Sequence, residues 1–110
     1  MKFRFIGALA IWLIPVIGYT SPTLKGTINE LWVADNNHPN TIFIRVGDTF
    51  TSPCSTSPSR YLIMDLDEPG MKEAYSMAMA AFFSNMEVSI GGKGNCRGSL
   101  EKLQYINVIK

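Results

Sequence analysis

The segment GGKGNC, at residues 91–96, contains the residue types of this 110-residue chain that come nearest to a chemical site. Glycines beside a lysine could bind a phosphate, and a cysteine could bind a metal. A Walker phosphate loop, however, needs GxxxxGK followed by Ser or Thr, between a strand and a helix. Here Gly94 follows Lys93, and the next element is expected to be a strand. We therefore predict a turn beside Cys96, in which the glycines supply positive φ angles.

The other reactive side chains do not assemble into a metal centre or a catalytic group. Metal sites need three or four ligands, and His38, in a turn beside Pro39, is the only histidine. Asp65 and Asp67 alternate at a strand end and could share a face. No partner suggests acid–base chemistry for them, and Asp67 can instead cap the following helix. We predict no enzymatic activity, no metal and no cofactor.

The first twenty residues are typical of a secretory signal peptide. Lys2 and Arg4 precede an uncharged run at residues 6–19, and small residues follow, so that cleavage is expected after Gly18 or Thr20. The run is shorter than the about 20 residues that cross a bilayer. An uncleaved membrane anchor is the alternative.

Removal of residues 1–20 leaves one domain, at residues 21–110. The whole chain has 10 Lys and Arg against 9 Asp and Glu; Lys2 and Arg4 leave with the signal peptide, so that 8 against 9 remain, a net charge of −1. No basic stripe of the kind that binds nucleic acid is left, and no polybasic tail for anionic membranes. We expect a periplasmic or secreted protein with no nucleic-acid partner and no stable membrane insertion.

Cys54 and Cys96 are the only cysteines. An even pair in an exported chain favours a disulfide, and the alternative is two free thiols. The bridge would close a loop of about 42 residues, which is worth about 4 kcal/mol in the chain-entropy model. Such a bridge is useful because a domain of about 90 residues buries only a modest core. The sequence therefore predicts a Cys54–Cys96 disulfide.

Hydrophobic alternation predicts five strands, and a helix between the third and the fourth. In the first strand the alternation slips near Asn29–Glu30, which indicates a bulge. Asp67 or Glu68 can cap the helix, and Pro69 suits its first turn. The predicted strands span residues 23–34, 41–46, 61–66, 87–90 and 103–109, and the helix runs from Met71 to about Asn85.

This order of elements is that of the OB-fold, a five-stranded Greek-key barrel. Strands three and five of such a barrel are parallel, so the loops that enter them lie at the same end. Cys54 is in the loop entering strand three, and Cys96 is in the loop entering strand five. Their pairing is therefore geometrically reasonable. The predicted fold class is mainly β with one helix, as an OB-fold-like barrel of order β-β-β-α-β-β.

The predicted helix carries two apolar surfaces. At 100° per residue, one wide face suits the barrel core. A second stripe combines the polar Lys72 and Ser76 with Met79 and Phe83. Two large apolar residues on an outward stripe indicate a subunit interface, unless the core or the long loops cover them. The core face consists of Met71, Ala74, Tyr75, Ala78, Ala81 and Phe82.

The loop after the first strand is a candidate ligand site. It contains Trp32, Asp35, Asn36, Asn37 and His38. In OB-folds this loop borders the ligand surface, and an aromatic ring beside amides and a carboxylate can serve as a platform for a sugar. The alternative is an ordinary polar turn after a packed tryptophan.

Three segments resemble the small secreted proteins related to B subunits of AB-type toxins: DLDEPGMKEAYSMAMAAFFSNMEVSI, the glycine stretch with Cys96, and LEKLQYINV. Subtilase-cytotoxin and pertussis-like binding subunits are examples. The resemblance covers most of residues 24–109 and implies an OB-fold, a disulfide, a ring-shaped pentamer with helices lining the centre, and binding to host glycans. Sialoside-binding members carry a small hydroxyl residue before the first-strand glycine. This chain departs from that pattern: if Gly26 is that glycine, Lys25 stands at this place, and it is the ligand-binding candidate there.

The residues and the resemblance together predict an exported, non-enzymatic binding module, glycan-binding and oligomeric. The alternative is a stand-alone periplasmic structural or inhibitor-like protein that binds another protein. A glycan array separates the two, because specific sugar binding is expected only for the first.

Overall fold

The computed structural model describes residues 21–33 and 39–110. The predicted signal peptide and the loop at residues 34–38 lie outside this part of the chain. Within it, no helix is both long enough and apolar enough to cross a membrane. The elements are β1 (Thr23–Val33), β2 (Thr41–Val46), β3 (Leu62–Asp65), α2 (Met71–Phe83), β4 (Glu87–Arg97) and β5 (Leu100–Ile109).

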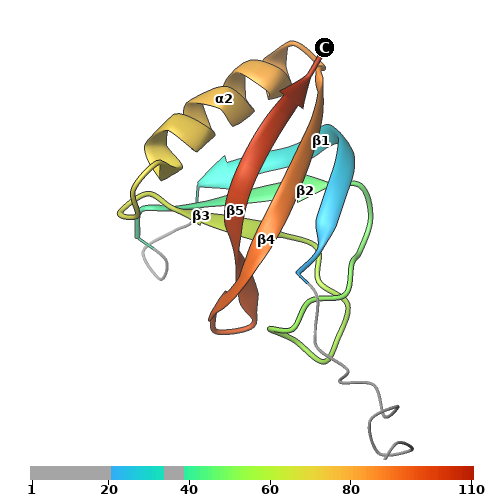
Figure 1. Cartoon of the computed structure of the whole chain (residues 1–110), viewed down its shortest axis with the longest axis vertical. Coiled ribbons are helices and arrows are strands. Elements are labelled where there is room, and N and C mark those ends of the chain that lie inside the picture. The colour runs from blue at the N-terminus through green and yellow to red at the C-terminus, as the bar shows by residue number, and fades with distance from the viewer. Residues whose placement is uncertain (1–20, 34–38) are drawn as a thin grey trace, which may run out of the picture.

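The described residues are mainly β, with one five-stranded sheet and one helix. The sheet closes into a barrel in the order β1-β2-β3-β5-β4. Neighbouring strands are antiparallel except β3 and β5, which run parallel. Helix α2 lies across one end of the barrel, and the β2–β3 loop and the β4–β5 turn lie at the opposite end (Figure 1). Aliphatic side chains from all five strands and one face of α2 form the core.

Strand β1 changes the direction of its side chains half-way, at a bulge. Its pairing with β2 shifts between Ile28 and Glu30, which confirms the predicted slip. Strict alternation would turn Glu30 and Trp32 inward together with the buried Ile28. With the shift, Trp32 instead opposes Phe43 on the outer face of the sheet. The bulge therefore places a carboxylate and an indole on the outside of the barrel.

Helix α2 begins without the predicted acidic cap. Its N-cap is Gly70, in a left-handed conformation with φ 83°, and no side chain caps the first turn. The prediction that Asp67 or Glu68 caps the helix is wrong because both carboxylates are used elsewhere. Asp67 accepts a hydrogen bond from Asn40 Nδ2 at 3.3 Å, and Glu68 binds two lysines. The predicted core face is confirmed, with Met71, Ala74, Ala78 and Ala81 buried and Tyr75 and Phe82 packed against the core.

The GGKGNC segment is part of a strand, and the prediction of a turn there is wrong. Strand β4 continues through it, with register shifts on both sides of Gly92, and the turn falls just beyond it. Two of the glycines have no room for a side chain, because residues of the neighbouring strand lie too close to them. A Cβ atom on Gly91 would collide with the ring of Tyr105, and one on Gly92 with the carboxylate of Glu101.

A disulfide and a buried carboxylate fasten the β2–β3 loop to the β4–β5 hairpin. Cys54 and Cys96 are bonded, with Cα atoms 5.4 Å apart, which confirms the predicted pair, although Cys96 lies within β4 and not in a loop. The carboxylate of Glu101 is buried and accepts hydrogen bonds from Ser52 Oγ at 2.6 Å and from the Gly94 amide at 3.0 Å. We call Ser52, Gly94 and Glu101 the Glu101 clasp.

Candidate functional site

An open cleft of about 490 Å³ lies beside the C-terminal half of β1. The residue before β3 and the end of α2 also line it. Its volume is within the roughly 300–1,000 Å³ of sites for small organic ligands. Four of the six described residues that line it are aromatic or aliphatic and two are polar, and sites for small ligands likewise combine apolar side chains with a few polar groups. We call it the Trp32 cleft, and its lining residues are Asn29, Glu30, Leu31, Trp32, Tyr61 and Phe82.

Three aromatic rings cluster at the cleft: Trp32 and Tyr61 line it, and the buried Phe43 packs against both. Trp32 stacks on its cross-strand partner Phe43, with ring centroids 4.3 Å apart and planes inclined by 20°. Tyr61 meets both rings edge-on, at 5.9 Å from Trp32 and 5.7 Å from Phe43. Such stacked and edge-on pairs are favourable arrangements of aromatic rings. Phe43 is buried, whereas Trp32 stays 41% exposed, so the indole is held in place and still accessible.

The carboxylate of Glu30 is fixed beside these rings. Oε1 accepts a hydrogen bond from Nη1 of the cross-strand partner Arg45 at 2.6 Å, and Oε2 accepts one from the Tyr61 hydroxyl at 3.0 Å. The hydrogen bond from Arg45 and then that from Tyr61 hold the pKa of Glu30 below its usual range. Glu30 is therefore ionised at neutral pH, and each carboxylate oxygen can still accept a further hydrogen bond.

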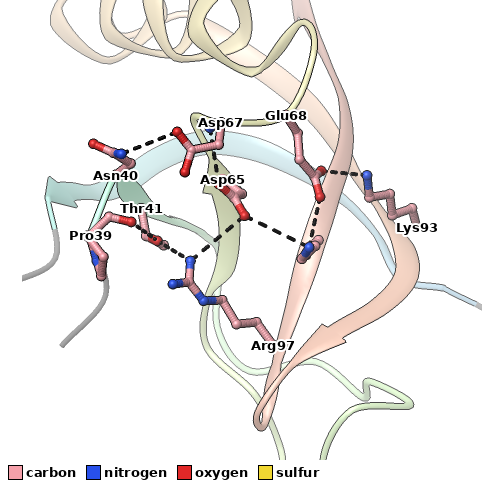
Figure 2. A network of polar contacts seen from close by, with 9 residues as sticks. Pro39, Asn40, Thr41, Asp65, Asp67, Glu68, Lys93 and Arg97 are labelled. Carbon is pink, nitrogen blue, oxygen red and sulfur yellow. Dashed lines mark hydrogen bonds and ion pairs between the residues drawn. The ribbon is translucent and has the colours of Figure 1, made fainter.

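A polar cluster joins the β3–α2 connection to β4 and β5 (Figure 2). Glu68 accepts a hydrogen bond from Lys93 Nζ at 2.7 Å on one oxygen and from Lys102 Nζ at 2.8 Å on the other. The hydrogen bonds from Lys102 and then from Lys93 lower the pKa of Glu68. This carboxylate therefore ties the start of the helix region to two strands that follow it in the sequence.

The same cluster continues to the beginning of β2. Asp65 Oδ2 lies 3.9 Å from both Arg97 Nη1 and Lys102 Nζ. Arg97 also donates a hydrogen bond from Nη1 to Thr41 Oγ1 at 2.6 Å. Because each of these cations already has a carboxylate partner, the cluster offers cross-links between strands rather than a vacant charge for a ligand.

The structure brings only part of the predicted ligand site together. Trp32 lines the cleft. Lys25 does not, because it lies in the other half of β1, opposite Ser89, where it is exposed and 3.8 Å from Glu87. Lys25 therefore lies apart from the Trp32 cleft, and its role as a ligand contact stays a prediction. The remaining candidates lie outside the described residues, and they are Asp35, Asn36, Asn37 and His38.

The predicted interface stripe lies on the open side of α2. Lys72 and Ser76 are exposed, and Ser76 Oγ donates to the Lys72 carbonyl at 3.2 Å. Met79 is half-buried, and Phe83 is 78% exposed. Neither the core nor the described loops therefore cover Phe83. Its ring meets that of Phe82 at 5.3 Å, so the stripe reaches the edge of the Trp32 cleft.

The sequence reasoning missed Glu30, Tyr61 and Phe82 as site residues. A usable signal was present for Glu30, because a bulge next to it gives it the same outward direction as Trp32. Tyr61 heads a strand whose alternation points it to the outer face. Phe82 has no such signal, because helical periodicity assigns it to the core.

Among the described residues, no group of three His, Cys, Asp or Glu side chains is arranged to hold a metal ion. Comparison with known proteins found no matching family model, no matching curated protein and no matching solved structure. The functional argument therefore depends on the geometry of the chain itself.

Proposed function

We propose that this chain is a glycan-binding module and that the Trp32 cleft is its ligand site. The observation that carries the proposal is the exposed indole of Trp32, backed by Phe43 and flanked by the fixed carboxylate of Glu30. A sugar ring has an apolar face that can stack on an indole and hydroxyl groups that can reach a neighbouring carboxylate. Among the described residues, the cleft is lined by aromatic, aliphatic, amide and carboxylate side chains, the groups that a sugar-binding site uses.

The proposal includes an OB-fold for the barrel. Its support is the strand order β1-β2-β3-β5-β4, the parallel β3–β5 pair and the helix between β3 and β4. OB-folds bind oligosaccharides and oligonucleotides on the outer face of strands two and three and on nearby loops. The Trp32 cleft has the corresponding place, since Tyr61 before β3 lines it and Phe43 of β2 packs behind Trp32. The net charge of −1 expected for residues 21–110 argues against an oligonucleotide ligand, because proteins that bind nucleic acid usually present a positive surface.

We also propose that the protein is exported, non-enzymatic and related to the B subunits of AB-type toxins. The Cys54–Cys96 disulfide supports export, because such bonds persist in oxidising compartments. The proposed kinship depends on the three sequence segments given above. A stand-alone periplasmic role in binding another protein remains the competing proposal.

One observation favours a partner surface in addition to the cleft. Phe83 is 78% exposed at the end of α2, and large apolar groups left open at the surface mark contact sites. We propose a second copy of this chain as the partner. Analytical ultracentrifugation of the wild type and of Met79→Lys/Phe83→Lys tests this. An oligomer that the substitutions dissociate is expected, and a wild-type monomer contradicts it.

A glycan array followed by calorimetric titration tests the sugar site. We expect wild-type protein to bind a defined set of glycans and Trp32→Ala to lose about fivefold or more in affinity, since the stacking ring is worth about 1 kcal/mol or more. Tyr105→Ala is the matched control, because Tyr105 is equally exposed, at 41%, but lines a different groove. Absence of any glycan ligand, or equal losses in both variants, contradicts the proposal.

A further inference from the structure

Two polar side chains of the Trp32 cleft direct a hydrogen-bond donor to the protein itself. The Tyr61 hydroxyl donates to Glu30 Oε2 at 3.0 Å, and Asn29 Nδ2 donates to the Gly47 carbonyl at 3.2 Å. Glu30, as a carboxylate, has no donor. Glu30 and Tyr61 therefore present acceptors to a ligand, which are the two carboxylate oxygens and the phenol oxygen.

The charge of the lining has one sign. Among the described residues that line the cleft, Glu30 is the only charged one. The guanidinium of Arg45 does not line it and makes its hydrogen bonds to Glu30 and, through Nε at 3.3 Å, to the Gly47 carbonyl. Arg60 is exposed and also lies outside the lining, although its charge acts on Glu30. An anionic ligand in the cleft would therefore meet a carboxylate before it met a cation.

We propose that the Trp32 cleft selects an uncharged saccharide, which directs hydroxyl donors toward Glu30 and Tyr61, and that it discriminates against sugars bearing a carboxylate or a sulfate. This inference rests on the proposed sugar-binding function and adds its specificity. Hydroxyl groups of a neutral sugar can donate to a carboxylate in strong, charge-assisted hydrogen bonds. A carboxylate or sulfate has no donor to offer to Glu30, and like charges at close range repel.

The discrimination can be measured with one oligosaccharide in two forms, with and without a terminal sialic acid, by calorimetric titration of the full chain. We expect the wild type to bind the neutral form about tenfold or more tighter than the sialylated form, which corresponds to about 1.4 kcal/mol. Glu30→Gln removes the charge and supplies a donor, so it is expected to weaken binding of the neutral form and to reduce the ratio between the two forms.

Two further variants separate specificity from folding. Tyr61→Phe keeps the ring and removes the phenol oxygen, so weaker binding of the neutral form is expected, with only the small fall in melting temperature that the loss of one hydrogen bond causes. Arg60→Gln is the charge-changing control outside the cleft, and it is expected to leave the neutral preference in place.

The outcomes distinguish this inference from the function on which it rests. Preference of the wild type for the sialylated or a sulfated form would leave sugar binding intact and overturn the inference. An unchanged ratio in Glu30→Gln, or loss of the neutral preference in Arg60→Gln, would also overturn it. If neither form nor any array glycan binds, the sugar-binding proposal itself fails.

Discussion

The Glu101 clasp predicts a large loss of stability from a small change in the β2–β3 loop, Ser52→Ala. Ser52 and Glu101 are 3% and 1% exposed, and the hydroxyl donates to the carboxylate at 2.6 Å. A hydrogen bond to a buried charge contributes about 1.5–3 kcal/mol. Ser52 Oγ also accepts a hydrogen bond from the Cys54 amide at 3.1 Å. Leaving this amide without its partner adds about 1 kcal/mol to the loss of stability. We therefore expect a total loss of about 3 kcal/mol.

Urea unfolding with the disulfide intact measures this loss, followed by circular dichroism and tryptophan fluorescence. A domain of this size has a slope of about 1–1.5 kcal/mol per molar urea, so the midpoint should fall by about 2–3 M. Ser57→Ala is the matched control in the same loop. Ser57 is exposed and its side chain makes no hydrogen bond to the described residues, so its change should stay within about 0.5 kcal/mol.

A double-mutant cycle assigns the loss to the Ser52–Glu101 contact. In a Glu101→Gln background the carboxylate charge is gone, so Ser52→Ala should cost only about 1 kcal/mol, which leaves a coupling energy of about 2 kcal/mol. If Ser52→Ala shifts the midpoint no more than Ser57→Ala, or if the two substitutions are additive, the clasp does not fasten the loop and the reasoning is refuted.

Two further predictions concern the Cys54–Cys96 disulfide and the ion pairs of Glu68. Replacement of both Cys54 and Cys96 by Ala should destabilise the protein by about 4 kcal/mol, because the bond closes a loop of 42 residues; a loss below about 1 kcal/mol in urea unfolding would contradict this. The lowered pKa of Glu68 means that its ion pairs stabilise the fold above the unfolded-state pKa, near 4.3, and that this contribution is lost as pH falls through the folded-state value. Glu68→Gln should therefore lose about 1 kcal/mol at pH 7 and show a smaller drop in stability between pH 7 and pH 3 than the wild type; equal acid dependence would count against it.

The sequence predicted local structure best where one residue determines the local geometry. The slip of alternation at Asn29–Glu30 predicted the bulge of β1, because a one-residue shift reverses every later side chain. The cysteine pair was predicted because an even number of thiols in an exported chain favours bonding. Alternation also gave β2 its observed bounds.

Errors arose where distant residues decide the conformation. The sequence predicted a turn at Gly91 and Gly92. In the structure this segment stays in the sheet, and Tyr105 and Glu101 of the next strand fill the space that side chains there would need. The expected acidic cap of α2 fails for the same kind of reason, since Glu68 is bound by lysines of β4 and β5. Sequence patterns do not carry these tertiary contacts.

The sequence predicted one residue of the candidate site, and the fold brings the other lining residues to it. Trp32 was selected as an aromatic beside a polar loop, but its neighbours come from three elements: Glu30 from the bulge, Tyr61 from the start of β3 and Phe82 from α2. Lys25 shares a strand with Trp32 and yet faces another part of the surface. Proximity in sequence therefore identified Trp32 but not the other residues that line the cleft.

The fluorescence of Trp32 during a sugar titration tests the central claim most directly. The chain has two tryptophans, Trp12 and Trp32, so the full chain carrying Trp12→Phe contains one indole, located in the cleft. We predict that the neutral oligosaccharide found by the array changes the Trp32 emission saturably, with the same Kd as calorimetry gives. Calorimetric binding with no change in Trp32 emission would place the ligand elsewhere and contradict the assignment of the cleft.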